Sequence, residues 1–194
     1  MLATLNKNKV IEYNKICKPY NISFLSLAEF TNISPEEDGK NFEENAIIKA
    51  KNAGNLTNWQ FPCLADDSGL CIKILKDRPG KDSAKWAEKV GYPNVFNFIK
   101  DKINDLGKEM NDQPAFFICC LALLYSPKKK KIFNGKLSGK LLFPPNGNNG
   151  FGYDPIFIPA GKNKTLAQLS SLEKNQISHR NNAVKKLIGF IFEK

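Results

Sequence analysis

The stretch Ala65-Asp66-Asp67-Ser68-Gly69-Leu70 governs how the rest of the chain is interpreted. Phe61, Cys63 and Leu64 precede it, and apolar residues alternate again over residues 70–74. This pattern predicts a strand, a tight polar turn and a second strand. Two adjacent carboxylates at a strand end need partners, usually a divalent cation or a positive charge. The alternative is a plain surface turn, because Asp, Ser and Gly are ordinary turn residues.

The composition indicates one sizeable domain, or one domain with two lobes, with an anionic partner. The 194 residues are 42% hydrophobic, which is enough for a real core. The formal net charge is +10, from 29 basic and 19 acidic residues. A nucleotide, a nucleic acid or a membrane surface would complement that charge, although solvated surface lysines would explain it equally. No basic stripe interleaved with aromatic residues favours nucleic acid.

The cysteines and the lone histidine limit the possible classes of site. Five cysteines with no CxxC spacing lie mostly in apolar runs, which predicts buried free thiols in a reducing compartment. A single histidine excludes a multi-histidine metal site. No apolar stretch reaches 18 residues, and residues 1–3 do not resemble a signal peptide. We therefore expect a soluble cytoplasmic protein.

The first third of the chain combines short apolar segments with polar loops. We expect a short strand at residues 1–4, a loop, and then a helix that Asn6 or Asn8 caps. The start of that helix, with Lys9, is a natural anion site, although a plain strand-to-helix connection is the better explanation of this segment taken alone. Residues 22–27 read as a strand.

A second helix is predicted from residue 42 onward. Asn41 and Glu44 have the spacing of a capping box, and alanines at 46, 50 and 53 form a thin face that can pack closely. Glu44 therefore has a structural explanation as a cap residue. Glu37 lies before the cap in a loop, where an acid is free to face a cation.

The remaining chain predicts further strands and helices. An amphipathic helix is expected over residues 94–106 and a short one from about residue 83. The apolar run 115–125 fits a central strand buried on both faces, and 132–142 fits its neighbour across a lysine-rich turn. Ser170 and Glu173 form a capping box. Ser178 precedes a last helix that begins with His179 and Arg180, and a basic pair there opposes the helix dipole unless an anion binds.

Gly152 lies between two aromatic residues, Phe151 and Tyr153. A glycine there allows the backbone to approach a flat ligand closely, and aromatic side chains can stack on a base. The alternative is a glycine-rich loop that enters a strand at 156–158.

Taken together and in order, six segments resemble the inosine triphosphate pyrophosphatase family, which hydrolyses faulty purine nucleoside triphosphates such as ITP, dITP and XTP. The segments are 4–9, similar to T-G-N-x-x-K; 37–49, similar to E-x-G-x-T-F-x-E-N-A-x-x-K; 65–70, which matches A-D-D-S-G-L; 79–85, similar to P-G-x-x-S-A-R; 150–157, which matches G-F-G-Y-D-P-I-F; and 173–180, similar to E-K-x-x-I-S-H-R. Six motifs in the right order are a far more specific signal than any one of them.

The resemblance implies an α/β fold with a long twisted mixed β-sheet flanked by helices, and two lobes with an active-site cleft between them. It also implies one domain over residues 1–194 that pairs as a homodimer, with no nucleic-acid or membrane partner. The implied reaction cuts between the α- and β-phosphates and gives the nucleoside monophosphate and pyrophosphate.

The resemblance also implies roles for individual residues. Asp67 is the metal ligand and general base, Glu37 is the second metal ligand, and the metal is Mg²⁺, with Mn²⁺ possible. Glu44 is a cap or outer-shell residue. The implied substrate-binding residues are Thr4, Asn6, Lys9, Lys49, Ser68, Lys85, Phe151, Gly152, Tyr153, Asp154, Lys174, His179 and Arg180. Among them the lysines at 9, 49 and 85 face phosphate, and residues 151–154, 174, 179 and 180 hold a base whose 6-oxo group accepts from cationic donors.

One departure from the family pattern keeps alternatives open. Leu5 stands where the family has glycine and could crowd the phosphate-binding backbone. A nucleotide-binding protein that has lost turnover is therefore one rival, although Glu37, Asp67 and Lys9 are intact. Nucleic-acid binding is another, and it rests only on the net charge.

Overall fold

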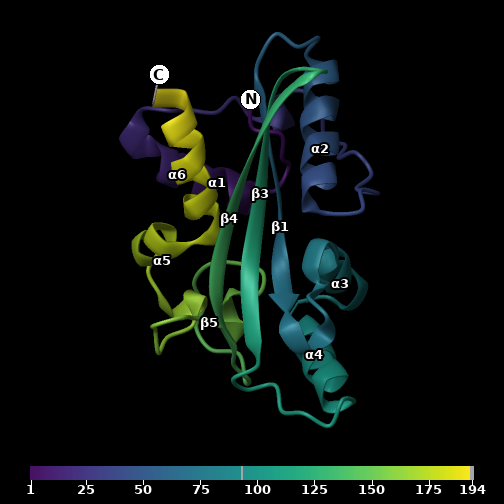
Figure 1. Cartoon of the computed structure of the whole chain (residues 1–194), viewed down its shortest axis with the longest axis vertical. Helices are drawn as coiled ribbons and strands as arrows, with labels where there is room; N and C mark the ends of the chain where they lie inside the picture. Colours follow the sequence, from purple (N-terminus) through teal and green to yellow (C-terminus); the bar gives the residue numbers. More distant parts are fainter. Residues whose placement is uncertain (93, 193–194) are drawn as a thin grey trace. The chain divides into compact units, whose positions relative to one another are not determined.

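The computed structural model of the chain describes residues 1–92 and 94–192, and its sheet has the strand order β2-β1-β3-β4-β5 (Figure 1). The strands are β1 (Cys63–Ile72), β2 (Arg78–Pro79), β3 (Pro114–Ser126), β4 (Lys129–Leu141) and β5 (Phe157–Pro159). They run antiparallel, with Cys71 opposite Pro79 and Leu141 opposite Phe157. Leu2 adds parallel bridges to Ser26 and Leu64. The predicted central strand, β3, is confirmed.

Helices flank the sheet, as the α/β prediction requires. The α-helices are α1 (Lys7–Cys17), α2 (Phe42–Leu56), α3 (Ser83–Val90), α4 (Asn94–Asn104), α5 (Ser171–Ile177) and α6 (His179–Phe192). Short 3-10 turns lie at Lys18–Tyr20, Leu27–Glu29, Lys73–Leu75, Gly80–Asp82, Asp154–Ile156 and Leu166–Gln168. Asn6 caps α1 through its side-chain oxygen, which confirms one of the two expected caps. The capping box of Ser170 and Glu173 is also confirmed.

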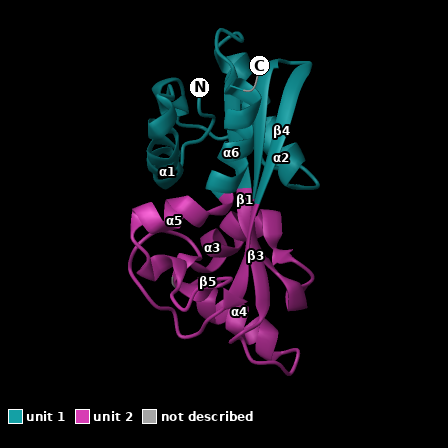
Figure 2. Cartoon of the chain, turned by 60° about the vertical axis from the view of Figure 1, so that its left-hand side comes forward, with its two compact units in different colours: residues 1–67, 119–135, 180–194 teal, residues 68–118, 136–179 magenta. Residues whose placement is uncertain are grey.

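The chain forms two compact units, each assembled from several segments (Figure 2). Unit 1 comprises residues 1–67, 119–135 and 180–194, and unit 2 comprises residues 68–118 and 136–179. Strands β1, β3 and β4 each contribute residues to both units. Because neither unit is a continuous piece of sequence, no single cut separates them, and the prediction of one domain over residues 1–194 stays a prediction.

The core of unit 1 includes the alanine face of α2. Ala46, Ala50 and Ala53 are fully buried and belong to one cluster with Ala65 and Cys120, which are contributed by β1 and β3. Small side chains let the helix backbone approach the sheet closely, which confirms the thin packing face. A second cluster of unit 1 packs α1 and α6 against strand residues.

The core of unit 2 lies under α4. Val95, Phe96, Ile99 and Ile103 recur at helical spacing and are buried with Leu70 and other strand residues. The polar residues between them face away, so the amphipathic helix predicted from this spacing is confirmed.

Three local predictions were wrong, and the first is the short strand expected at residues 1–4, where Leu2 alone is bridged. The Asp-Asp-Ser-Gly stretch is no turn, because β1 runs without interruption through residues 63–72 and nearly all of it is buried. Its carboxylates are stabilised inside the strand by cations from distant segments. Residues 22–27 form no regular strand, and this segment pairs at Ser26 by a single bridge to Leu2.

The five cysteines are buried and free, as predicted. Within residues 1–92 and 94–192, no helix is both long and apolar enough to cross a membrane.

Candidate active site

A carboxylate cluster of Glu37, Lys49 and Asp67 lies in unit 1. The Lys49 ammonium donates to Asp67 Oδ1 at 2.7 Å and to Glu37 Oε2 at 3.1 Å. Asn45 Nδ2 donates to the other oxygen of Asp67 at 3.3 Å. Asp67 and Lys49 are buried, whereas a third of the Glu37 side chain is exposed. One cation therefore joins the two acids that the sequence proposes as metal ligands.

Helix α2 sets the geometry of this cluster. Asn41 Oδ1 accepts from the Glu44 backbone N–H at 2.9 Å and begins the helix, and Asn45 and Lys49 follow one turn apart on the same face. The Glu44 carboxylate accepts from the Lys40 N–H at 2.7 Å, so Glu44 stabilises the helix start. This agrees with the cap role considered for it.

The loop that carries Glu37 is held by a close contact at Gly39. The Gly39 N–H donates to Asn45 Oδ1 at 2.9 Å, and a Cβ at Gly39 would lie 2.5 Å from the same oxygen. A glycine is required at this position, because any side chain would push the loop off the helix. Asn45 thus orients both the loop and the Asp67 carboxylate.

The two acids of the cluster have opposite pKa shifts. Burial raises the pKa of Asp67 to about 6, and the nearby Glu37 charge adds to the shift while Lys49 opposes it. Burial also acts on Glu37, but Lys49 and a hydrogen bond with Asp67 outweigh it and lower the pKa of Glu37. Two close carboxyl groups keep one proton more readily than two isolated ones. Asp67 is therefore the group suited to exchange a proton near neutral pH.

Asp66 is the centre of a separate buried network in unit 1. Its Oδ1 accepts from the Lys9 ammonium at 2.9 Å, and its Oδ2 accepts from Tyr13 at 2.7 Å and from Arg180 Nε at 2.8 Å. Arg180 Nη1 also donates to Glu12 Oε2 at 3.1 Å. Burial opposes ionisation, yet Lys9 and Arg180 hold the pKa of Asp66 well below its usual range.

The sequence predicted that Asp66 needs a positively charged partner, but it named none, and it assigned no role to Glu12 or Tyr13. Glu12 and Tyr13 lie three and four residues after Lys9 on α1, which places them on its face of the helix. The helical spacing from Lys9 is the sequence feature that could have identified Glu12 and Tyr13 as its neighbours. The Arg180 partner could not be found this way, since 114 residues separate it from Asp66.

The first loop of unit 1 is organised by its own polar groups. Thr4 Oγ1 accepts from the Asn6 N–H at 3.2 Å, and Asn6 Oδ1 accepts from the backbone N–H groups of Asn8 and Lys9. Leu5 is partly buried against the alanine cluster and is not among the described residues with positive φ. The leucine therefore fits this loop without backbone strain.

In unit 2, residues 151–154 form an aromatic turn around the Asp154 carboxylate. Asp154 Oδ2 accepts from the Phe151 N–H at 2.8 Å and from the Lys174 ammonium at 2.6 Å. The same ammonium lies 4.6 Å from the centre of the Phe151 ring. Gly150 and Gly152 both have positive φ, and a Cβ at Gly150 would collide with Asp154. The predicted base-binding residues of this turn thus lie together with Lys174.

Tyr153 fastens this turn to the start of α3. Its hydroxyl donates to the Ser83 carbonyl at 2.7 Å, and Ser83 Oγ donates to the Gly80 carbonyl at 2.6 Å. Ser83 Oγ also accepts from the Leu70 N–H at 3.0 Å. A Cβ at Gly69 would lie 2.1 Å from the Gly80 carbonyl oxygen, so β1 needs glycine beside this contact.

The other predicted residues have distinct surroundings. Ser68 is partly buried in β1, and Lys85 is exposed on α3, 3.9 Å from Asp82 Oδ1. The His179 ring stacks on Phe117 with a centroid distance of 4.8 Å and an interplanar angle of 12°. Arg180 belongs to the Asp66 network, where it donates to Asp66 and Glu12.

The two acids predicted as metal ligands lie together, with the Lys49 ammonium between them. Among the residues that the structure describes, no group of three or more His, Cys, Asp or Glu side chains could enclose a metal. Glu37 and Asp67 supply two carboxylates, one of them partly exposed. Mg²⁺ is usually held by one or two carboxylates together with water and substrate phosphates.

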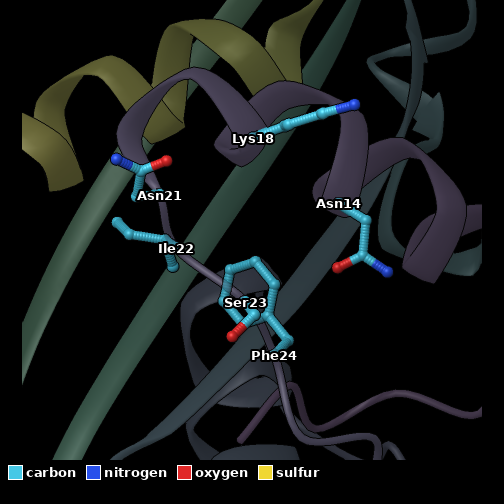
Figure 3. Close-up of a pocket in the computed structure, with 6 residues that line it drawn as sticks. All are labelled: Asn14, Lys18, Asn21, Ile22, Ser23 and Phe24. Carbon is cyan, nitrogen blue, oxygen red and sulfur yellow. The ribbon is translucent and has the colours of Figure 1, made fainter.

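An open pocket of about 510 Å³ lies elsewhere in unit 1 (Figure 3). It is lined by Asn14, Lys18, Asn21, Ile22, Ser23 and Phe24. The lining includes no carboxylate and none of the predicted site residues, so its chemistry does not match the predicted reaction.

Comparison with known proteins decides the family. The model of the Ham1 family matches residues 1–190. The chain belongs to the Ham1 family. A Ham1 protein of Coxiella burnetii has a similar structure, with a TM-score of 0.86 and 35% identity over 100% of this chain and 98% of that one.

Other Ham1 relatives carry names that state an activity. A dITP/XTP pyrophosphatase of Bacillus subtilis is 42% identical over 96% of this chain and 93% of its own length. One of Lactiplantibacillus plantarum is 40% identical over 97% and 92%, respectively. The resemblance to the inosine triphosphate pyrophosphatase family is thereby confirmed.

Proposed function

We propose that this Ham1 protein hydrolyses the faulty purine nucleoside triphosphates dITP, XTP and ITP to the monophosphate and pyrophosphate. The buried Asp67 carboxylate, held by Lys49 and Asn45 beside Glu37, is the observation that carries the proposal. Relatives of 34% to 42% identity named dITP/XTP pyrophosphatase support the substrate class.

Asp67 is the general base in this proposal. A carboxylate with a pKa near 6 is mostly ionised at neutral pH, yet it accepts a proton from water more readily than an ordinary aspartate. Asn45 and Lys49 fix both of its oxygens, so the carboxylate is oriented before the substrate arrives. Asp67 takes a proton from the water, whose oxygen attacks the α-phosphorus. The bond between the α-phosphorus and the oxygen that bridges to the β-phosphorus breaks, and pyrophosphate leaves.

Glu37 and Asp67 would hold Mg²⁺, or Mn²⁺, together with the triphosphate. The metal, when bound, neutralises charge that develops on the phosphate oxygens. Lys9, Lys49 and Lys85 supply the remaining positive charge, with Thr4, Asn6 and Ser68 as polar contacts to the phosphates.

The aromatic turn of residues 151–154 binds the base, together with Lys174 and His179. A 6-oxo purine offers an acceptor where adenine presents an amino group, so a cationic donor favours the former. Lys174 is buried and already fixed by Asp154, which orients the donor. Arg180 is fixed by Asp66 and Glu12, and we assign it the task of holding Asp66 and, through it, Lys9.

The homodimer and the cytoplasmic location are part of the same proposal. The homodimer rests on the family resemblance, and light scattering of the purified protein tests it. The location rests on five buried thiols with no disulfide among them, which suits a reducing compartment.

Pyrophosphate release from a panel of nucleoside triphosphates tests the function. We expect a higher kcat/KM for ITP, dITP and XTP than for ATP and the pyrimidine triphosphates, with release dependent on added Mg²⁺. Binding of XTP without any release would instead identify a nucleotide-binding protein. A salt-sensitive shift of duplex DNA without hydrolysis would point to nucleic-acid binding.

A further inference from the structure

Tyr92 is a half-exposed aromatic residue beside the aromatic turn of unit 2. It lies between α3 and α4, in a stretch that matches no family motif, and 52% of its surface is exposed. Its ring meets Tyr153 edge-on at a centroid distance of 5.8 Å and Phe96 at 6.0 Å. These contacts fix the ring although much of it faces solvent.

The Tyr92 hydroxyl reaches the turn itself. It forms a hydrogen bond with the hydroxyl of Tyr153. The Tyr153 hydroxyl also donates to the Ser83 carbonyl at 2.7 Å, which ties both tyrosines to the start of α3. A Cβ built on Gly152 would lie 3.7 Å from the Tyr92 oxygen, so this hydroxyl lies directly over the Gly152 backbone.

The contacts with Tyr153 and Phe96 hold the Tyr92 ring in place, so its exposed face can stack against a flat ligand. Gly152 carries no side chain, and the Tyr92 oxygen is the neighbouring atom that a Cβ there would meet, so Tyr92 borders the exposed side of this turn. An aromatic ring that is already held in place loses little entropy on contact with a base, and every base has a face on which it can stack.

We propose that the exposed ring of Tyr92 forms one wall of the nucleobase subsite and packs against the purine. The inference rests on the proposed function, because residues 151–154 are the base-binding turn only if the substrate is a nucleotide. It adds to the site a residue that the sequence motifs do not contain.

Product binding separates this role from a phosphate contact. We would measure inhibition by xanthosine monophosphate and by inorganic pyrophosphate for the wild type, Tyr92→Ala and Tyr92→Phe. Leu106→Ala is the matched control, since Leu106 is an apolar residue of unit 2 with a similar exposure of 53%. The melting temperature of each variant is recorded on the same preparation.

We expect Tyr92→Ala to raise the KM for XTP and the inhibition constant of the monophosphate about tenfold, the scale of one lost stacking contact. Inhibition by pyrophosphate should stay unchanged. Tyr92→Phe, which keeps the ring, should remain within about twofold of the wild type, as should the Leu106 control.

Three outcomes would overturn the inference. They are an unchanged monophosphate inhibition constant in Tyr92→Ala, an equal weakening for pyrophosphate, and a loss in Tyr92→Phe as large as in Tyr92→Ala. If Tyr92→Ala fails to fold, Tyr92→Leu is measured instead and judged by the same criteria. A wild type that releases no pyrophosphate from XTP contradicts the proposed function, and direct titration of the monophosphate then still tests the ring contact.

Discussion

The Lys49 ammonium lies 2.7 Å from the Asp67 carboxylate, although the two residues are 18 positions apart in the sequence. The same ammonium contacts Glu37, so a single lysine balances two acids. This arrangement lets Asp67, on the buried strand β1, lie close to the loop acid Glu37, because the desolvation cost of the buried carboxylate is offset by a cation and an amide.

Asp67→Asn should lower kcat by about 100-fold or more, the scale of losing a general base. Nucleotide binding should survive better than turnover, because the amide keeps the shape of the side chain. Steady-state kinetics with saturating Mg²⁺ and a binding titration measure the two quantities. Asp38→Asn, an exposed acid of the Glu37 loop, is the control. Near-wild-type turnover of Asp67→Asn would show that another group is the base.

Asp66→Asn should lower the free energy of unfolding at pH 7 by about 3 kcal/mol or more, because it leaves Arg180 and Lys9 without their buried partner. The pKa of Asp66 is lowered in the folded protein, so its contribution is present above the unfolded pKa of about 4 and is lost as pH falls further. The difference between variant and wild type should therefore shrink below pH 4. Urea unfolding from pH 7 down to pH 3 measures it, and a difference that is independent of pH would contradict the assignment.

Leu5→Gly should lower the free energy of unfolding by roughly 1 to 2 kcal/mol, because a partly buried side chain is lost and the unfolded chain gains freedom. Activity should stay unchanged or rise, mainly through a lower KM, since the family has glycine at this position. Kinetics and urea unfolding on one preparation test both parts. A sharp fall in kcat/KM would mean that this loop has its own geometry and that the roles of Thr4 and Asn6 need revision.

Arg180→Ala should show its main effect on stability. Its guanidinium bridges Asp66 and Glu12, so its loss leaves two buried carboxylates and should cost about 3 kcal/mol. Residual activity should fall by the same factor for ITP and ATP. The melting temperature and the kcat/KM values for ITP and ATP distinguish a role in stability from a role in reading the base. A selective loss on ITP with an unchanged melting temperature would restore a base-reading role for this residue.

Lys174→Gln should instead reduce the preference for 6-oxo purines. The glutamine keeps a donor but loses the charge, and a hydrogen bond to a charged donor is worth roughly 1.5 to 3 kcal/mol. We expect kcat/KM for XTP to fall about tenfold while that for ATP changes little. Lys164→Gln, an exposed lysine of the same unit, is the control. Equal losses on both nucleotides would argue against a contact with the base.

The sequence-based predictions were most accurate for features that depend on residues close together in the chain, such as helix caps and the buried face of a helix. Asn6 and Asn41 cap their helices through side-chain bonds within three residues, and the spacing over α4 fixes its buried face. The same local reasoning failed at Asp66 and Asp67. Their turn preference is overridden by cations that come from residues 9, 49 and 180, which no local pattern reveals.

The sequence named the residues of the Glu37, Lys49 and Asp67 cluster, but it did not predict the contacts between them. The motif match named Lys49, Glu37 and Asp67, but not that one ammonium joins the two acids. The family resemblance and the basic cluster at the helix starts placed Arg180 with Lys174 and His179 at the base. Adjacent residues at a helix start point in different directions, and its side chain meets Asp66 and Glu12.

The labelling rates of the five buried thiols would report local unfolding in the unmodified protein. Burial raises the pKa of Cys17 to about 11 and that of Cys71 to about 12, so thiolate is scarce in the closed state and a maleimide must wait for an opening event. Cys71 belongs to unit 2, whereas Cys17, Cys63, Cys119 and Cys120 belong to unit 1. Peptide mapping of the labelling rates would therefore give a separate opening equilibrium for each unit without a single engineered probe.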